Sequence, residues 1–131
     1  NPETASLIHK LRPMYEVSTL AVEMISRMLD YKGEMESSVV RMQSAKVQFS
    51  DEMKSQGFKV LSTHGNFIHV AFSEHEECIH DFLKDKVYYR KSFHQTCLQG
   101  YTRFSIGSQD VMSEVAEFIK SAVKEKINGN D

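Results

Sequence analysis

Residues 66–72, Asn-Phe-Ile-His-Val-Ala-Phe, are apolar at both alternating sets of positions after Asn66, with His69 as the exception. This pattern is typical of a central β-strand that is covered on both faces. Before it, residues 58–62 predict a short strand, joined to 66–72 by a Thr63-His64-Gly65 turn. After it, the sequence predicts strands at 87–91 and 102–106.

Helices are expected on either side of these strands. The first runs from a Ser18 N-cap to about Tyr31 and ends at Gly33. Three more helices are expected. The second spans residues 34–56, the third begins at a Ser73–Glu76 capping box and reaches residue 83, and the last runs from 108 to about 127. Residues 1–17 are expected to be an extended lead-in, because Pro2 and Pro13 disfavour helix.

The predicted order of elements is α, α, β, β, α, β, β, α, in which helices and strands alternate only in part. Such an order favours an α+β fold, here a small, largely antiparallel sheet with helices packed on one face. We expect residues 18–131 to form a single domain of this kind.

Composition narrows the class of protein. A net charge of −2 and a pI near 6.3 provide no positive field for nucleic acid or an anionic membrane. No apolar run is long enough to cross a bilayer. Cys78 and Cys97 are compatible with reduced thiols. These features predict a cytoplasmic protein without nucleic-acid or membrane partners.

Metal binding and nucleophilic catalysis receive little support. In residues 74–80, EHEECIH, His75 and Cys78 lie one helical turn apart, but no second Cys/His pair completes a zinc site. Cys97 and His94 lie three residues apart in a predicted loop, a spacing that is common by chance. The Ser121-x-x-Lys124 pattern lies on the polar face of the last predicted helix, without the burial that would lower a lysine pKa. We therefore expect no metal site and no catalytic residue in this chain.

Two arginines stand out because each lies within a predicted strand. Arg90 follows Val87-Tyr88-Tyr89, and Arg103 lies among Tyr101, Phe104 and Ile106. The planar guanidinium can bind a carboxylate or phosphate through two parallel hydrogen bonds. From the pattern alone, the alternative that both are solvated arginines on an open sheet face stays open.

Four motifs in their order resemble the C-terminal part of fold type I, pyridoxal-phosphate-dependent aminotransferases, and most of all the histidinol-phosphate aminotransferase-like group. They are Arg12-Pro13-Met14-Tyr15-Glu16-Val17-Ser18, Asn66-Phe67, Tyr88-Tyr89-Arg90 and Gly100-Tyr101-Thr102-Arg103-Phe104-Ser105-Ile106-Gly107-Ser108. The likeness spans about residues 11–124. Met14 departs from the commoner Arg-Pro-Pro-Tyr, and Tyr89 replaces the usual valine.

The resemblance implies that Arg103 binds the substrate's α-carboxylate and that Arg90 binds a distal anionic group, with Tyr15 and Asn66 also in the substrate site. It implies pyridoxal 5'-phosphate as cofactor, a homodimer, and a large domain of the same polypeptide that supplies the cofactor lysine. That lysine has no counterpart in this chain, so the fragment alone is expected to be inactive.

Two alternatives belong to other classes of protein. A small α+β domain of this kind can be a free-standing ligand-binding or regulatory module. An RNA-binding sheet that uses Tyr88, Phe104 and His69 is disfavoured by the acidic balance of the chain.

Overall fold

The computed structural model describes residues 1–10 and 17–128 and contains two compact units, Asn1–Glu36 and Ser37–Asp131. The division therefore falls after Glu36, whereas the sequence predicts it after residue 17. The first unit holds helices α1 (Pro2–Lys10) and α2 (Thr19–Met28) and the 3-10 turn η1 (Leu29–Tyr31), and helix α3 (Lys32–Ser55) begins within it.

The prediction of an extended lead-in over residues 1–17 is wrong for its first part, because α1 is helical. Pro2 occupies the first helical position, where a proline is tolerated since no intrahelical bond needs its missing N–H. The side chain of Asn1 caps the helix by accepting a hydrogen bond from the Glu3 amide at 3.0 Å.

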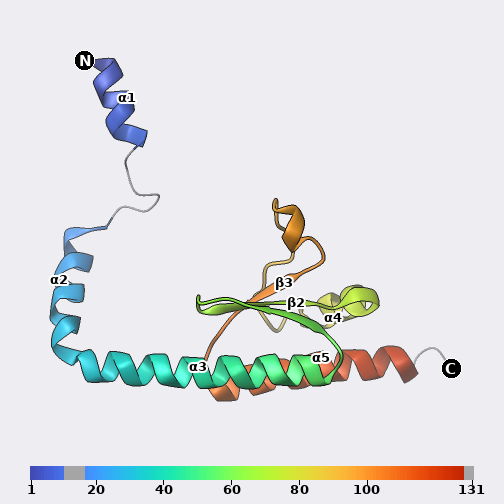
Figure 1. The fold of residues 1–131 in the computed structure, drawn as a ribbon. Helices are drawn as coiled ribbons and strands as arrows, with labels where there is room; N and C mark the ends of the chain where they lie inside the picture. The colour runs from blue at the N-terminus through green and yellow to red at the C-terminus, as the bar shows by residue number, and fades with distance from the viewer. Residues whose placement is uncertain (11–16, 129–131) are drawn as a thin grey trace. The chain divides into compact units, whose positions relative to one another are not determined.

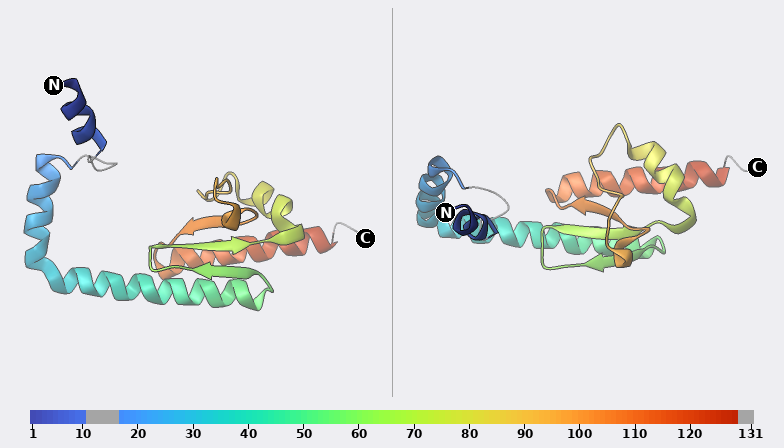
Figure 2. Two further views of the ribbon diagram at one scale, coloured as in Figure 1. Left: turned by 45° about the horizontal axis from the view of Figure 1, so that its top comes forward. Right: turned by 90° about the horizontal axis from the view of Figure 1, so that it is seen from above.

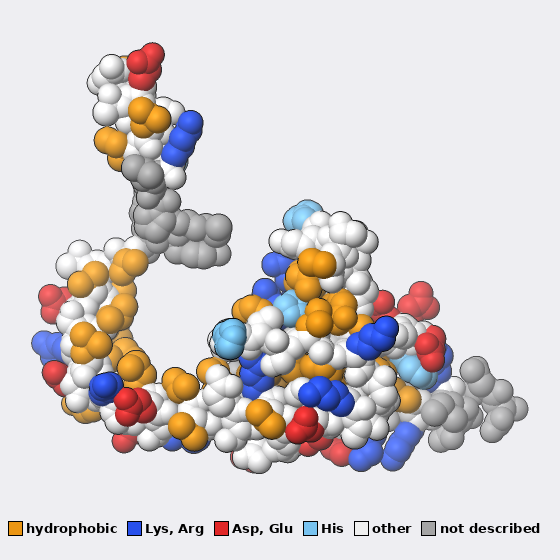
Figure 3. Space-filling view, in the orientation of Figure 1, with side chains coloured by type: hydrophobic (Ala, Val, Ile, Leu, Met, Phe, Trp, Pro, Cys, Tyr) orange, Lys and Arg blue, Asp and Glu red, His pale blue; other side chains and the backbone are white. Residues whose placement is uncertain are grey.

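Helix α2 begins as predicted, with the Ser18 hydroxyl accepting a hydrogen bond from the Ala21 amide at 3.2 Å. Its apolar side chains are exposed in the described part of the chain and are visible on its surface in Figure 3. The most exposed of them, Leu20, keeps 70% of its surface accessible. Gly33 does not end a helix as predicted but lies inside α3, because η1 passes directly into that helix.

The second unit contains an antiparallel sheet of three strands in the order β1-β2-β3, where β1 is Lys59–Ser62, β2 is Phe67–Ala71 and β3 is Thr102–Ser105. The central place of β2 was predicted from residues 66–72. Helices α4 (Glu76–Leu83) and α5 (Gln109–Asn128) and the 3-10 turns η2 (Ser73–His75) and η3 (Thr96–Leu98) complete the unit (Figure 1).

The predicted strand over residues 87–91 is reduced to a single β-bridge between Arg90 and Arg103. The turn after α4 explains the difference, because the amides of Lys86 and Val87 both bond to the carbonyl of Leu83 at 2.9 Å. These bonds hold the start of the segment away from β3. Tyr88 is consequently fully exposed.

The predicted capping box at Ser73 does not form. Ser73 adopts a positive φ of 51° and begins η2, and α4 starts at Glu76 without a side-chain cap. The N-cap position is His75 and not Ser73, so the α-helix expected here begins two residues later than the motif indicates.

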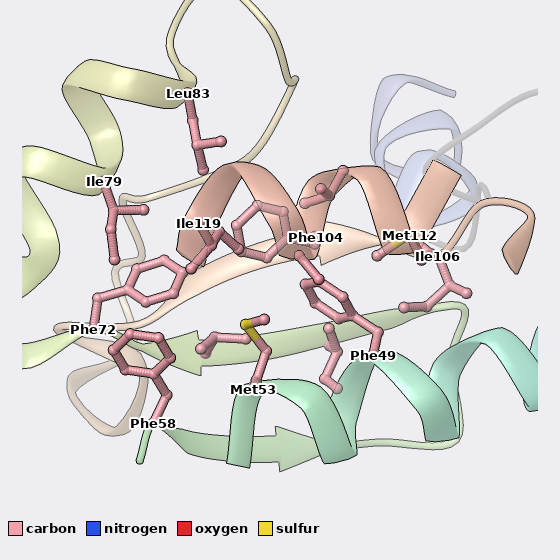
Figure 4. Close-up of a cluster of buried hydrophobic side chains, with 14 of the residues drawn as sticks. Phe49, Met53, Phe58, Phe72, Ile79, Leu83, Phe104, Ile106, Met112 and Ile119 are labelled. Carbon is pink, nitrogen blue, oxygen red and sulfur yellow. The ribbon is translucent and has the colours of Figure 1, made fainter. Parts of the chain in front are cut away.

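Helices α3, α4 and α5 pack on one face of the sheet, as predicted. Helices α3 and α5 run side by side under the strands (Figures 1 and 2), linked by hydrogen bonds from Gln48 to Ser113 at 2.9 Å and from Gln109 to Gln48 at 2.5 Å. Their apolar side chains meet those of the inner sheet face in one core (Figure 4), which includes Phe49, Met53, Ile68, Val70, Phe72, Ile79, Leu83, Phe104, Met112 and Ile119.

Lys46 is the one buried lysine among the described residues, with 3% of its surface exposed. Its ammonium group donates hydrogen bonds from α3 to the carbonyls of Thr63 and Gly65, the latter at 2.7 Å. These bonds satisfy polar groups in the β1–β2 turn and fix the chain immediately before Asn66.

His80 is a residue of α4, and its side chain is buried against β3. One of its ring nitrogens lies 2.8 Å from the Thr102 hydroxyl, and the ring stacks on Tyr89 with the centroids 5.0 Å apart. Burial, and to a lesser degree the charge of Lys91, lower the pKa of His80 below its ordinary value. The folded state therefore favours the neutral ring.

This shift predicts a pH-dependent stability. Because the unfolded chain takes up a proton on His80 more readily than the folded chain, the free energy of unfolding should fall as the pH drops below about 6.5. His80→Gln should show a shallower decline between about pH 7.5 and 5.5 in urea unfolding. His64→Gln, in the exposed turn, is the control and should match the wild type. Equal slopes for His80→Gln and wild type would contradict the assignment.

Candidate functional site

The strand pairing places four side chains in a row across the outer face of the sheet. Leu61 of β1 pairs with His69 of β2, His69 pairs with Arg103 of β3, and Arg103 pairs with Arg90. Arg90 and Arg103 exchange both backbone hydrogen bonds, at 3.0 and 2.7 Å. Directly opposite residues of an antiparallel pair point to the same face, so the two arginines lie side by side, away from the helices.

Aromatic rings support both guanidinium groups. The Arg103 guanidinium carbon lies 5.2 Å from the centroid of Phe67, and that of Arg90 lies 5.1 Å from the centroid of Phe93. Arg90 also donates from Nε to the carbonyl of Ser92 at 3.0 Å. Such contacts hold the guanidinium planes while the remaining N–H groups stay available to a ligand.

The charge of the arginine pair is not neutralised within the part of the chain that the structure describes. None of the salt bridges among these residues includes Arg90 or Arg103. Like charges that face each other directly destabilise a ladder, so the arrangement costs free energy when no anion is bound. An anion between the two guanidinium groups would remove that cost.

The surroundings of the pair are also basic. Residues 86–109 contain Lys86, Arg90, Lys91 and Arg103 but no aspartate or glutamate. A hollow of about 430 Å³ next to Arg90 is lined by residues 89–94, which include Lys91 and His94. Lys91 and His94 were not assigned to the site from the sequence. The absence of acidic residues over this stretch is the signal that could have found them.

His69 lies in this row between Leu61 and Arg103. It is only 4% exposed, and its Nδ1 has no hydrogen-bond partner among the described residues. Burial, and next the charge of Arg103, lower the pKa of His69. The sequence marks His69 as an exception in an apolar strand and as part of the disfavoured RNA-binding alternative, but it does not place it beside Arg103. That placement follows from the strand register.

Asn66 and Tyr15 were also predicted to belong to the site. Asn66 is exposed directly before β2, and its backbone carbonyl accepts a hydrogen bond from the Ile106 amide at 2.8 Å. Tyr15 lies outside the described residues.

The structure of the described residues gives no support for metal binding, cysteine chemistry or RNA binding. In the ranges 1–10 and 17–128, no three His, Cys, Asp or Glu side chains are grouped so that they could hold a metal ion. The Cys78 thiol donates to the His75 carbonyl at 3.1 Å, and both cysteines are free. Phe104 is 2% exposed and points into the core, so it offers no surface for base stacking.

No helix in the described ranges combines the length and the apolar content needed to cross a membrane.

The fold and the site together describe an α+β domain that presents two arginines on the outer face of its sheet. The model of the family described as aminotransferase class I and II matches residues 2–119, and the chain belongs to this family.

Curated relatives agree with this assignment. The chain is 24% identical over 125 residues to the histidinol-phosphate aminotransferase of Buchnera aphidicola subsp. Schizaphis graminum, and 26% identical over 114 residues to that of Geotalea daltonii. These alignments cover 92% and 86% of this chain but 35% and 33% of the relatives. The chain thus spans about a third of the length of the curated relatives that it matches.

Among solved structures, the chain is similar to a proposed aminotransferase of Burkholderia pseudomallei K96243, with a TM-score of 0.63 and 20% identity. The match covers 91% of this chain and 38% of the other. At this identity the similarity supports the fold, which is the small α+β fold predicted from the sequence.

Proposed function

We propose that this chain is the substrate-binding small domain of a pyridoxal-phosphate-dependent aminotransferase that acts on an anionic amino substrate. The observation that carries the proposal is the bridged pair Arg90 and Arg103, which has no acidic partner among the described residues. Membership of the aminotransferase family supplies the class of reaction.

In this proposal Arg103 binds the α-carboxylate of the substrate through a bidentate contact. Because Arg103 lies on β3 and is stacked on Phe67, its side chain is held ready on a rigid strand. Arg90 binds a distal anionic group, which is a phosphate or a second carboxylate, next to the hollow lined by Lys91 and His94. Asn66 and Tyr15 remain proposed members of the same site.

The described residues do not fit a site for the cofactor itself. The cofactor needs a lysine amine that is both free to react and enclosed in a site. The buried Lys46 is tied to two backbone carbonyls, and every other described lysine is exposed or only partly buried. We therefore propose that the cofactor lysine belongs to a large domain of the same polypeptide and that the complete enzyme is a homodimer. The small domain formed by this chain supplies anion recognition, while the cofactor supplies the electron sink for amino transfer.

The experiment is an amino-transfer assay on the complete enzyme that contains this chain. Three donors of similar size are compared, which carry a distal phosphate, a distal carboxylate or an uncharged distal group. The two anionic donors should have values of kcat/KM at least about tenfold higher than the uncharged donor, because each gains a charge-assisted contact. Absence of amino transfer, or a preference for the uncharged donor, would contradict the proposal.

A further inference from the structure

His69 has surroundings that packing alone does not explain. It lies at the centre of β2 on the outer face, with Phe67 and Phe93 edge-on to its ring at centroid distances of 5.5 and 5.3 Å. Its neighbours along the strand, Ile68 and Val70, are fully buried apolar residues on the other face. A leucine would fill such a position between two phenyl rings without any need for a polar partner.

The histidine instead brings a buried ring nitrogen, Nδ1, for which the described residues provide no hydrogen-bond partner. A buried polar atom that loses water without gaining a partner destabilises the folded state. Polar groups in this condition are exceptional in native proteins and call for an explanation, such as a ligand that completes them.

The direction in which a ligand would approach follows from the strand register. His69 is directly opposite Arg103, which in turn is directly opposite Arg90. An anion held by the two arginines would therefore lie next to the imidazole. Phe93, which lies edge-on to the imidazole, belongs to the irregular segment 91–95, which is not part of a strand.

We infer that His69 is a third ligand of the bound anion, with an imidazole N–H that donates to an oxygen of the carboxylate or phosphate held by Arg103. The inference rests on the proposed function. A neutral imidazole carries one N–H donor and one lone pair, so it can make this contact without adding a third positive charge to the row. The lowered pKa of His69 agrees with a neutral ring in the absence of ligand.

This role gives a combination of effects that a structural role does not. In His69→Leu the anion loses a ligand, so the affinity for inorganic phosphate should fall about five- to twentyfold. The same change removes an unpartnered buried nitrogen, so the midpoint of urea unfolding should stay the same or rise. His69→Asn, which places an amide near the position of Nδ1, should recover part of the affinity.

The test uses this chain and titrates it with inorganic phosphate, following the ring nitrogen signals of His69 by NMR. In the wild type the His69 signals should shift with the same dissociation constant as the backbone signals around Arg103. His64→Leu, which changes an exposed histidine in the β1–β2 turn, is the matched control and should leave the affinity unchanged.

Two results would overturn the inference. One is an unchanged phosphate affinity in His69→Leu, and the other is a lowered unfolding midpoint in that variant, which would assign His69 to packing. If the wild type binds phosphate and requires Arg103 but tolerates leucine at position 69, only this inference fails. If the wild type does not bind phosphate, or binds it equally well after Arg103→Ala, the proposed function fails with it.

Discussion

Replacing Arg103 by alanine is expected to lower kcat/KM of the complete enzyme by roughly two to three orders of magnitude. The change removes two parallel charge-assisted hydrogen bonds to the substrate carboxylate, each worth about 1.5–3 kcal/mol, and 1.4 kcal/mol corresponds to about a factor of ten. It also leaves a desolvated anion without its main partner. Steady-state kinetics with the preferred anionic donor would measure the effect.

Two further variants make this result specific to the site. Arg103→Lys keeps the charge but loses the planar fork, so it should recover only part of the activity. Arg41→Ala removes an exposed arginine on α3, on the helical side of the sheet, and should leave kcat/KM unchanged. If Arg103→Ala and Arg41→Ala behaved alike, Arg103 would be a surface arginine without a part in binding.

Replacing Phe104 by alanine should destabilise the second unit by about 3–5 kcal/mol, as is typical for a phenylalanine removed from a core. Phe104 is 2% exposed and packs edge-on against Phe49 of α3 and Phe72 after β2, with centroid distances of 5.7 and 6.1 Å. Truncation would leave a cavity where the sheet meets the helices (Figure 4).

Urea unfolding followed by circular dichroism would measure this loss. Tyr88→Ala is a suitable control, because Tyr88 is an aromatic residue of the same unit but is 103% exposed. This change should alter the stability by no more than about 0.5 kcal/mol. A loss below about 1 kcal/mol in Phe104→Ala would contradict the described core.

Much of the fold could be predicted because local signals and tertiary structure agree. The apolar run 66–72 became the central strand β2, and the Ser18 cap and the apolar periodicity of residues 108–127 marked helices that the structure contains. The strand expected at 87–91 could not be judged from its own residues, since the turn after α4 decides whether they reach β3. Gly33 was misjudged because a glycine permits a helix end but does not require one.

The arginine pair was predicted as the candidate site, and the structure brings Arg90 and Arg103 into direct opposition. His69 could not be assigned in the same way. Its position beside Arg103 depends on strand register, which a shift of one residue would reverse, and its unpartnered nitrogen is a property of the folded state alone.

The most direct test of the account is an NMR titration of this chain, labelled with ¹⁵N-arginine, with inorganic phosphate. The side-chain signals of Arg90 and Arg103 should shift together with a single dissociation constant, while those of Arg27 and Arg41 should stay in place. Unchanged signals for the pair, or shifts of Arg27 and Arg41 equal to those of the pair, would mean that these two guanidinium groups do not form an anion-binding site.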